Sequence, residues 1–269
     1  MNFLRELIYS IFKEVVDLYK FRWVCFSYVN STLKLRYRRS VLGFFWSLLG
    51  PTLNYLMVGI VFSFALKSKN ERFFLYFFSG TAIFNLFSVI ANASPGLLLV
   101  NESYIKKIYL PKTIFILNNV LMEFVNFLLA LAALIVIGMI TGYLSPTWSF
   151  LILPIPIFLT LVFATGIACL LSTATVFFRN FFNIVPIVVQ GMFFCSPILY
   201  SIEMVPEKYQ KFILLNPMYY FIEFFRTLVY SDSLPSLHIM AMSLGLCGAS
   251  LLVGLVTLKV LDNDIIFRL

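Results

Sequence analysis

The sequence predicts an all-α integral membrane protein with six transmembrane helices, built as a single domain over residues 1–269. Of its residues, 61% are hydrophobic and only 12% are charged, whereas charged residues make up about 25% of a typical soluble domain. Runs without any charge cover 40–66, 73–101, 124–178, 180–202 and 233–258. About 20 apolar residues are enough for a helix to cross a bilayer, so the longest run must contain two spans and a turn.

Residues 1–39 are expected to lie at the cytoplasmic face of the membrane. Within 1–22, apolar residues recur at helical spacing on one face and charged residues occupy the other, which is typical of an amphipathic helix that lies in the membrane interface. A basic collar follows, with Arg36, Arg38 and Arg39 directly before an apolar run. Such a collar anchors the chain at the cytoplasmic face and its anionic headgroups. Guanidinium groups also bind phosphate oxygens in a bidentate manner, so a diphosphate site is the alternative, and the two roles are compatible.

The first span is expected at about 41–66 and the second at about 73–93, joined by a short charged loop. Between Pro95 and Pro111 lies a segment in which apolar residues still recur at helical spacing among charged ones. This segment is too short and too charged to cross a bilayer. We therefore expect an exposed amphipathic helix between the second and third spans.

The remaining spans are expected at about 113–140, 150–176, 183–197 and 237–258. Gly142 and Ser145-Pro146 are turn-forming and separate the third span from the fourth. A short polar tail follows the sixth span.

The segment 200–236 is amphipathic and is broken at Asn216-Pro217, where Asn is a good N-cap and Pro suits the first helical position. We expect two short re-entrant helices that enter the membrane from the outer side without crossing it. In the second of them, one face carries Met218, Phe221, Ile222 and Phe225. The other face carries Tyr219, Glu223, Arg226 and Tyr230.

The distribution of lysine and arginine sets the expected orientation. With six spans both termini share one side, and that side collects fourteen of these residues, whereas the other side collects six. By the positive-inside rule, both termini are cytoplasmic. The net charge of +8 is accordingly attributed to the cytoplasmic face and its anionic lipids.

The chain shows no catalytic constellation. It contains no Gly-x-x-x-x-Gly-Lys-Ser/Thr loop and no His-Glu-x-x-His pair, and its one histidine, His238, lies at the outer end of the last predicted span. The four cysteines form no Cys-x-x-Cys pair and are expected to be packing residues. We therefore expect no metal, no cofactor and no enzymatic activity; if the protein moves a substrate uphill, a partner must supply the energy.

Three sequence features together resemble one known family. They are the run from Arg36 to Trp46 followed by Pro51, the run from Asn101 to Pro111, and Ser196-Pro197-Ile198-Leu199-Tyr200 followed by Asn216-Pro217 and Arg226. In this order and spacing the chain resembles, over nearly its whole length, the permease subunits of ABC-2 type transporters, in particular the O-antigen and capsular polysaccharide exporters. Where that family often has Arg-Asp after the fourth span, this chain has Arg179-Asn180, so no salt bridge is assumed there.

The resemblance implies a homodimeric permease of the cell inner membrane that binds two copies of an ABC ATPase subunit, with ATP bound by the ATPase. Its substrate would be a glycan carried on undecaprenyl diphosphate, and no nucleic acid is involved. The family's coupling helix, which docks on the ATPase, matches Asn101, Glu102, Tyr104, Ile105, Lys106, Lys107 and Ile108. The resemblance also implies that the N-terminal helix meets the ATPase. It further implies that 200–230 forms an outer gate and that spans one and five border a lateral opening to the lipid.

Several side chains are candidates for contact with such a substrate, in addition to the collar arginines. Flat aromatic rings stack on sugars, and the candidates are Phe45, Trp46, Tyr55, Tyr219 and Tyr220. Packing against lipid and at the membrane interface is the alternative for each ring. Glu123 shares a helix face with Asn119 and Asn126. As an acid within a span it should face protein or water, so it either makes a polar contact between helices or lines a channel.

Two other functions are compatible with parts of this pattern. A teichoic acid exporter or another lipid exporter of the same superfamily would share every feature described above. A membrane-embedded enzyme that modifies glycans is the alternative from another class, but it requires a cluster of acids or histidines that the sequence lacks.

Overall fold

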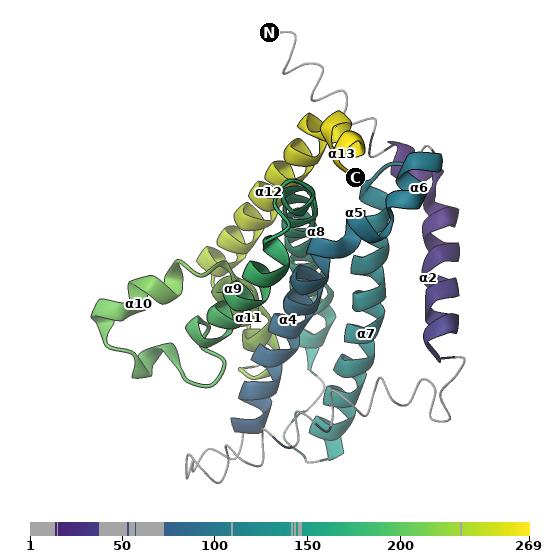
Figure 1. Ribbon diagram of the computed structural model, residues 1–269. Coiled ribbons are helices and arrows are strands. Elements are labelled where there is room, and N and C mark those ends of the chain that lie inside the picture. Colours follow the sequence, from purple (N-terminus) through teal and green to yellow (C-terminus); the bar gives the residue numbers. More distant parts are fainter. Residues whose placement is uncertain are drawn as a thin grey trace.

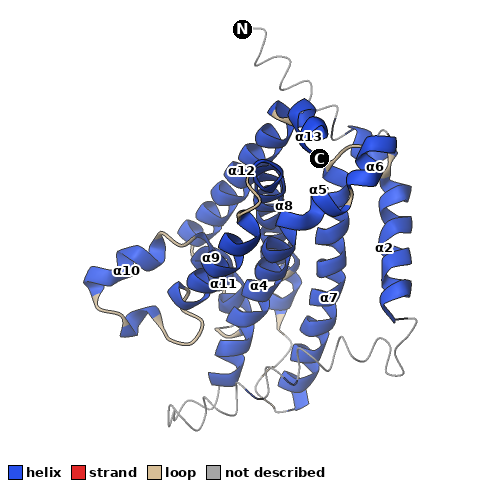
Figure 2. Ribbon diagram, in the orientation of Figure 1, coloured by secondary structure: helices blue, strands red, loops and turns tan. Residues whose placement is uncertain are grey.

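The computed structural model describes residues 14, 16–37, 53, 57, 73–108, 110–140, 142, 144, 147–231 and 233–269. Over these ranges the chain is helical and contains no strand (Figure 2). The all-α fold class is therefore confirmed for this part of the chain. The predicted first span at 41–66 lies outside the described residues, apart from positions 53 and 57.

Four described stretches are long and apolar enough to cross a membrane: Leu75–Val100, Thr113–Val136, Trp148–Phe177 and Leu237–Val260. They correspond to the predicted second, third, fourth and sixth spans. Their helices are α4 (Phe73–Ala93), α7 (Thr113–Ile140), α8 (Pro154–Phe177) and α12 (Leu237–Val260). A 3-10 helix, Trp148–Ile152, leads into α8.

The predicted fifth span corresponds to helix α9 (Phe181–Cys195), which has 15 residues. This is shorter than the roughly 20 residues of a typical membrane-crossing helix. Its bounds have clear local causes, because the turn at Arg179-Asn180 precedes it and Ser196-Pro197 follows it. Pro186 lies inside α9.

Most of the interface helix predicted at 1–22 lies outside the described residues, which begin with 14 and 16–37. The described chain is helical from 16 and continues as α2 (Arg22–Tyr37), which lies beside α7 in Figure 1. Backbone bonds from the Phe21 amide to Asp17 O (3.0 Å) and from the Cys25 amide to Phe21 O (3.1 Å) keep the chain helical across the junction. Apolar side chains of α2, including Trp23 and Phe26, are exposed.

Helices α8 and α12 lie side by side (Figure 1) and share the most extensive contact among the described helices. A Cβ atom on Gly254 would lie 2.2 Å from the backbone oxygen of Gly166, and one on Gly166 would lie 2.3 Å from the backbone carbonyl carbon of Ser250. Small residues allow this approach, which favours helix association in membranes through close packing. The hydroxyl of Ser250 adds a hydrogen bond of 3.3 Å to Phe163 O on α8.

A buried aromatic cluster joins α8 to α4 and α11. The ring of Phe163 lies 5.6 Å from that of Phe87 on α4 and 4.8 Å from that of Phe221 on α11, measured between centroids. Such contacts add to the stabilisation from apolar burial. The predicted apolar face of α11 is confirmed, since its residues Met218, Phe221, Ile222 and Phe225 are all buried.

The break predicted at Asn216-Pro217 separates α10 (Glu207–Leu214) from α11 (Pro217–Val229). In Figure 1, α10 projects from the side of the bundle, in the half away from α6 (Glu102–Lys107). We call α10 and α11 together the hairpin. The predicted polar tail instead contains a short helix, α13 (Asp262–Arg268), whose Ile265 is buried.

The contact between α8 and α12 gives a test with a matched control on the same helix. Substitution Gly254→Ala should lower the free energy of unfolding by about 1–3 kcal/mol, because the added methyl group collides with the backbone of α8. In contrast, Gly248→Ala should leave stability unchanged or raise it by about 0.5–1 kcal/mol, since nothing lies within 4 Å of its added Cβ. Unfolding of the purified protein in detergent measures both, and equal effects at the two positions would contradict the described packing.

Candidate functional site

The chain bends sharply where α4 ends. A 3-10 turn (Ser94–Gly96) is followed by α5 (Leu97–Val100) and then by α6. The hydroxyl of Ser94 donates to Ile90 O (2.6 Å), and the hydroxyl of Ser172 on α8 donates to Ser94 O (2.8 Å). Because Ser94 and Ser172 are both buried, this hydrogen bond joins the bend to α8 inside the bundle.

Helix α6 lies at one end of the bundle (Figure 1), and its residues Ser103, Tyr104, Lys106 and Lys107 are exposed. The side chains of Tyr104 and Ile108 are 54% and 52% exposed. Lys106 pairs with Glu102 at 2.7 Å, and Lys107 is exposed.

The other two residues expected to contact the ATPase point inward. Asn101 is buried and donates from Nδ2 to Leu97 O (2.7 Å), and Ile105 packs against the core. The coupling residues predicted from the sequence therefore divide into an outward set and a set that holds α6 in place.

A cluster of ion pairs braces the bundle beside α6. Lys112, just before α7, pairs with the carboxylate of Asp262 on α13 and donates to its backbone oxygen at 2.6 Å. Glu14 pairs with Lys259 on α12 and accepts a hydrogen bond from Thr113. Lys112 and Glu14 are both buried. Charges removed from water require such partners, so the cluster ties α7, α12, α13 and the N-terminal segment together at this end of the molecule.

The other end of the bundle is organised by Asn216. Its Nδ2 donates to Ser196 Oγ (2.9 Å) and to Met192 O (3.2 Å), and its Oδ1 accepts from the Met218 amide (3.0 Å). One side chain thus caps α11 and ties the hairpin to the end of α9.

Arg226 on α11 is only 2% exposed, although the sequence placed it on the polar face of that helix. Its Nη1 donates to the hydroxyl of Tyr76 on α4 (3.1 Å) and to Glu223 Oε2 (3.3 Å). Burial lowers the pKa of the Arg226 guanidinium, while Tyr76 and Glu223 beside it act in the opposite direction. An arginine remains charged under such conditions, so the structure contains a buried cation at the junction of α4 and α11.

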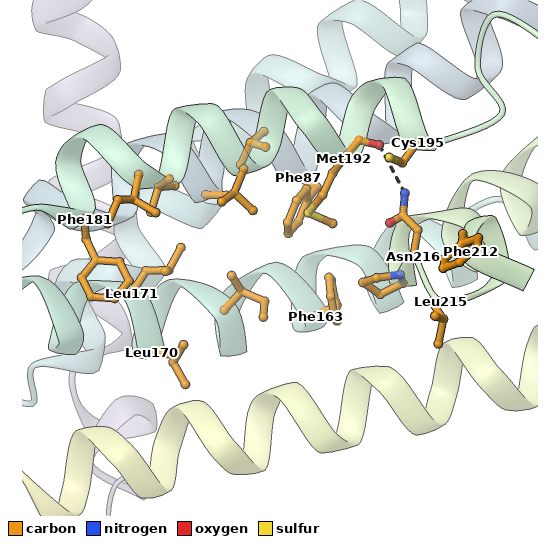
Figure 3. Close-up of a pocket in the computed structure, with 17 residues that line it drawn as sticks. Phe87, Phe163, Leu170, Leu171, Phe181, Met192, Cys195, Phe212, Leu215 and Asn216 are labelled. Carbon is orange, nitrogen blue, oxygen red and sulfur yellow. Dashed lines mark hydrogen bonds between the residues drawn. The ribbon is translucent and has the colours of Figure 1, made fainter. Parts of the chain in front are cut away.

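An apolar groove lies between α4, α8, α9 and the hairpin (Figure 3), and its volume is about 590 Å³. Phe87, Phe163, Leu171 and Phe212 are among its lining residues. Among the described residues that line it, Asn216 alone has a strongly polar side chain, and it lies at one end. A groove of this composition accommodates hydrocarbon and offers few hydrogen bonds to a sugar.

The predicted substrate residues fall into two groups. Glu123 lies within α7 and accepts a hydrogen bond from Asn126 Nδ2 (2.8 Å), while Asn119 Nδ2 is buried with no hydrogen-bond partner in the described part of the chain. Tyr219 and Tyr220 are adjacent on α11, with their ring centroids 5.2 Å apart. Tyr220 is buried and donates to Leu214 O (3.0 Å), whereas Tyr219 is half-buried.

The remaining predicted substrate residues belong to the N-terminal third of the chain. Arg36 lies in the last turn of α2, and its side chain is outside what the structure describes. Outside the described residues altogether are Arg38, Arg39, Phe45, Trp46 and Tyr55. The structure therefore does not bring the collar and the aromatic candidates of the first span into one described site.

Comparison with known proteins identifies relatives over most of the chain. The family model of the ABC-2 type transporter matches residues 24–230. An "O-antigen export system permease protein RfbA" from Klebsiella pneumoniae is 32% identical over 190 residues, which cover 70% of this chain and 73% of that protein. A protein of the same name from Myxococcus xanthus is 28% identical, covering 82% and 85% respectively. The "Polysialic acid transport protein KpsM" from Escherichia coli is 23% identical, covering 78% and 83%.

The bonds of Asn216 predict a loss of stability on truncation. Substitution Asn216→Ala should lower the free energy of unfolding by about 2 kcal/mol, because a helix cap and two buried hydrogen bonds are lost together. Asn92→Ala is the control, since Asn92 is exposed and donates only to Ser88 Oγ on its own helix (3.3 Å). Thermal unfolding in detergent compares the two variants, and an equally small effect at both positions would show that Asn216 does not hold the hairpin.

Proposed function

The chain belongs to the ABC-2 type transporter family, and we propose that it is the permease subunit of an ATP-driven exporter of lipid-linked polysaccharide. Relatives named for O-antigen export and polysialic acid transport support this substrate class. In the proposed assembly, two copies of the chain and two ABC ATPase subunits work together in the cell inner membrane, with both termini of the permease cytoplasmic. The ATPase binds and hydrolyses ATP, so the permease needs no cofactor of its own.

The observation that carries this proposal is the exposure of α6 at the end of the bundle. Tyr104 and Ile108 offer apolar anchors and Lys107 an exposed positive charge, while Asn101 and Ile105 hold the helix against the core. Helices with this composition bind in grooves of partner proteins. In the proposed complex, the partner groove belongs to the ATPase.

The substrate is proposed to be a glycan linked to undecaprenyl diphosphate. Arg36, Arg38 and Arg39 would bind the diphosphate, because guanidinium groups match phosphate oxygens. The apolar groove of Figure 3 supports a place for part of the polyprenyl chain beside α9, since its lining is almost entirely hydrocarbon. Phe45, Trp46 and Tyr55 would follow the collar on the first of six spans and would contact the sugars.

The glycan is proposed to pass between two copies of the chain. Helix α9 supports a homodimer, because its side chains such as Ile187 and Phe194 are exposed and Val185 and Val189 are its buried residues.

At the hairpin end, half-buried Tyr219 stands one helical turn from Glu223, which gives a ring for stacking on a sugar and a carboxylate for its hydroxyl groups. Buried Tyr220 would support this surface from below, and Glu123 would contribute a polar group along α7.

A matched pair of exposed tyrosines tests the docking role of α6. Substitution Tyr104→Asp should weaken binding of the ATPase by about 2 kcal/mol or more, the loss typical of a central aromatic anchor. Tyr209→Asp on α10 is the control, because Tyr209 is 52% exposed but belongs to the hairpin. Copurification of the tagged permease with the ATPase encoded in the same host measures both. An undisturbed complex with Tyr104→Asp would contradict docking through α6.

The substrate class is tested by ATP hydrolysis of the complex reconstituted in lipid nanodiscs. Defined undecaprenyl diphosphate glycans should stimulate hydrolysis, whereas the same lipid without a glycan should not, because the proposal requires both diphosphate and sugar contacts. Stimulation by a teichoic acid precursor alone would instead assign the chain to the teichoic acid exporters of the superfamily. Turnover of a glycan by the purified chain without any ATPase would overturn the transport role.

A further inference from the structure

Helix α4 connects the two ends of the molecule that the proposed function requires. Tyr76 lies in its first turn, and the bend leading to α6 follows its last residue, Ala93. With 21 residues, α4 spans about 30 Å at 1.5 Å per residue. It is an uninterrupted helix, and its far end leads through Ser94–Gly96 and α5 directly into α6. A displacement of α6 can therefore be transmitted to the hairpin end through α4, which is one continuous helix.

At the hairpin end, the surface of α4 accommodates the side chain of Arg226 on α11. The Cζ atom of Arg226 lies 3.8 Å from the ring centroid of Tyr76, close enough for a cation–π contact. One turn further along α4, a Cβ atom on Gly80 would lie 2.4 Å from Arg226 Nη2. Tyr76 and Gly80 thus form a seat in which the ring supports the guanidinium and the glycine leaves room for it.

The hydroxyl of Tyr76 extends this contact to a third element. It accepts from Arg226 Nη1 (3.1 Å) and lies within donating distance of two carbonyl oxygens, those of Tyr200 (2.9 Å) and Pro197 (3.2 Å). These carbonyls belong to the turn that follows α9. The ring of Tyr230, just after α11, packs edge-on against Tyr76 at 5.5 Å. One tyrosine therefore joins α4, the end of α9 and the C-terminal half of the polar face of α11.

Stability alone does not account for a cation at this place. Glu223 provides the one carboxylate close to Arg226 among the described residues, at 3.3 Å, and Nε and Nη2 of Arg226 are buried without a hydrogen-bond partner there. Removing a charge and two N–H groups from water is costly, and an apolar side chain of similar volume is often at least as stable. What the guanidinium adds is directional: it fixes the position of α11 on α4.

We infer that Arg226 is a positioning residue for transport, which holds the hairpin to α4 so that movement of α6 displaces the hairpin. The inference rests on the proposed function, because it requires an ATPase that acts on α6. It assigns the seat formed by Tyr76 and Gly80 as the point where that movement reaches the hairpin. Loss of the contact should leave the ATPase bound and active while its hydrolysis no longer drives export.

The contact itself is tested on the purified full-length chain, without ATPase or substrate. Arg226→Met removes the charge and keeps most of the volume, and Tyr76→Phe removes only the hydroxyl. Both should raise amide hydrogen exchange in Pro217–Val229 and in the first two turns of α4, because the hairpin loosens. Lys208→Met is the matched control: its cation lies 5.8 Å from the ring centroid of Tyr209 within the hairpin and is exposed. Wild-type exchange in both Arg226→Met and Tyr76→Phe would overturn the inference.

The coupling role is tested with the complex reconstituted in vesicles. The number of glycans exported per ATP hydrolysed should fall about 2- to 30-fold in Arg226→Met and Tyr76→Phe, the range of coupling effects seen for such contacts. Lys208→Met should match wild type. Arg226→Lys should recover part of the loss, because it restores a charged donor without the planar guanidinium. If Arg226→Met does not fold, Tyr76→Phe carries the comparison.

Three outcomes of the export experiment overturn this role. Unchanged export per ATP in Arg226→Met and Tyr76→Phe would show that the contact does not transmit movement, and parallel losses of hydrolysis and export would indicate a merely structural role. A wild-type complex that exports nothing would overturn the proposed function and the coupling with it, while the exchange experiment would still report on the contact.

Discussion

The scarcity of water in a bilayer is the constraint on which this structure depends, because each backbone polar group within a span must find its partner inside the protein and buried side-chain polar groups gain from doing the same. Most hydroxyl groups in the described spans meet this requirement locally. Thr81, Thr160 and Thr175 each donate to the carbonyl oxygen four residues earlier, at 2.6–2.7 Å. A hydroxyl group that bonds within its own helix does not connect that helix to another one. The few polar bonds that cross between helices therefore define how the bundle is arranged.

These crossing bonds occur where the chain must be held at a particular place. Ser172 joins the bend after α4 to α8, and Asn216 joins the hairpin to the end of α9. Between these points, α8 and α12 pack through Gly166 and Gly254 with their backbones in contact. Glycines at these positions let the two backbones meet, so α8 and α12 pack directly against each other.

The sequence predicted the elements bounded by strong local signals. Charges at Arg72 and Lys259 and prolines at 111 and 217 set the ends of α4, α12, α7 and α11 to within a few residues. Contacts between residues that are far apart in the sequence have no local signal of this kind, so they were not predicted. Helical spacing placed Arg226 with Glu223 on the polar face, and its burial follows from Gly80, which leaves space on another helix. The pairs of Lys112 with Asp262 and of Glu14 with Lys259 likewise depend on the three-dimensional arrangement of the chain ends.

The central position of α4 strengthens the case for movement through it. In the candidate span Leu75–Val100, which contains most of α4, half of the most apolar segment is buried inside the protein. The same share is buried in the span that contains α8, whereas the share for α12 is 17%. Helix α4 contacts α7, α8, α9 and α11, so a shift of α4 along α8 necessarily changes its contacts with each of the others. The aromatic contacts of Phe87 are apolar and permit sliding, because they have no directional hydrogen bonds. The contact between Tyr76 and Arg226 is directional, and it would therefore carry the hairpin along where the apolar contacts slip.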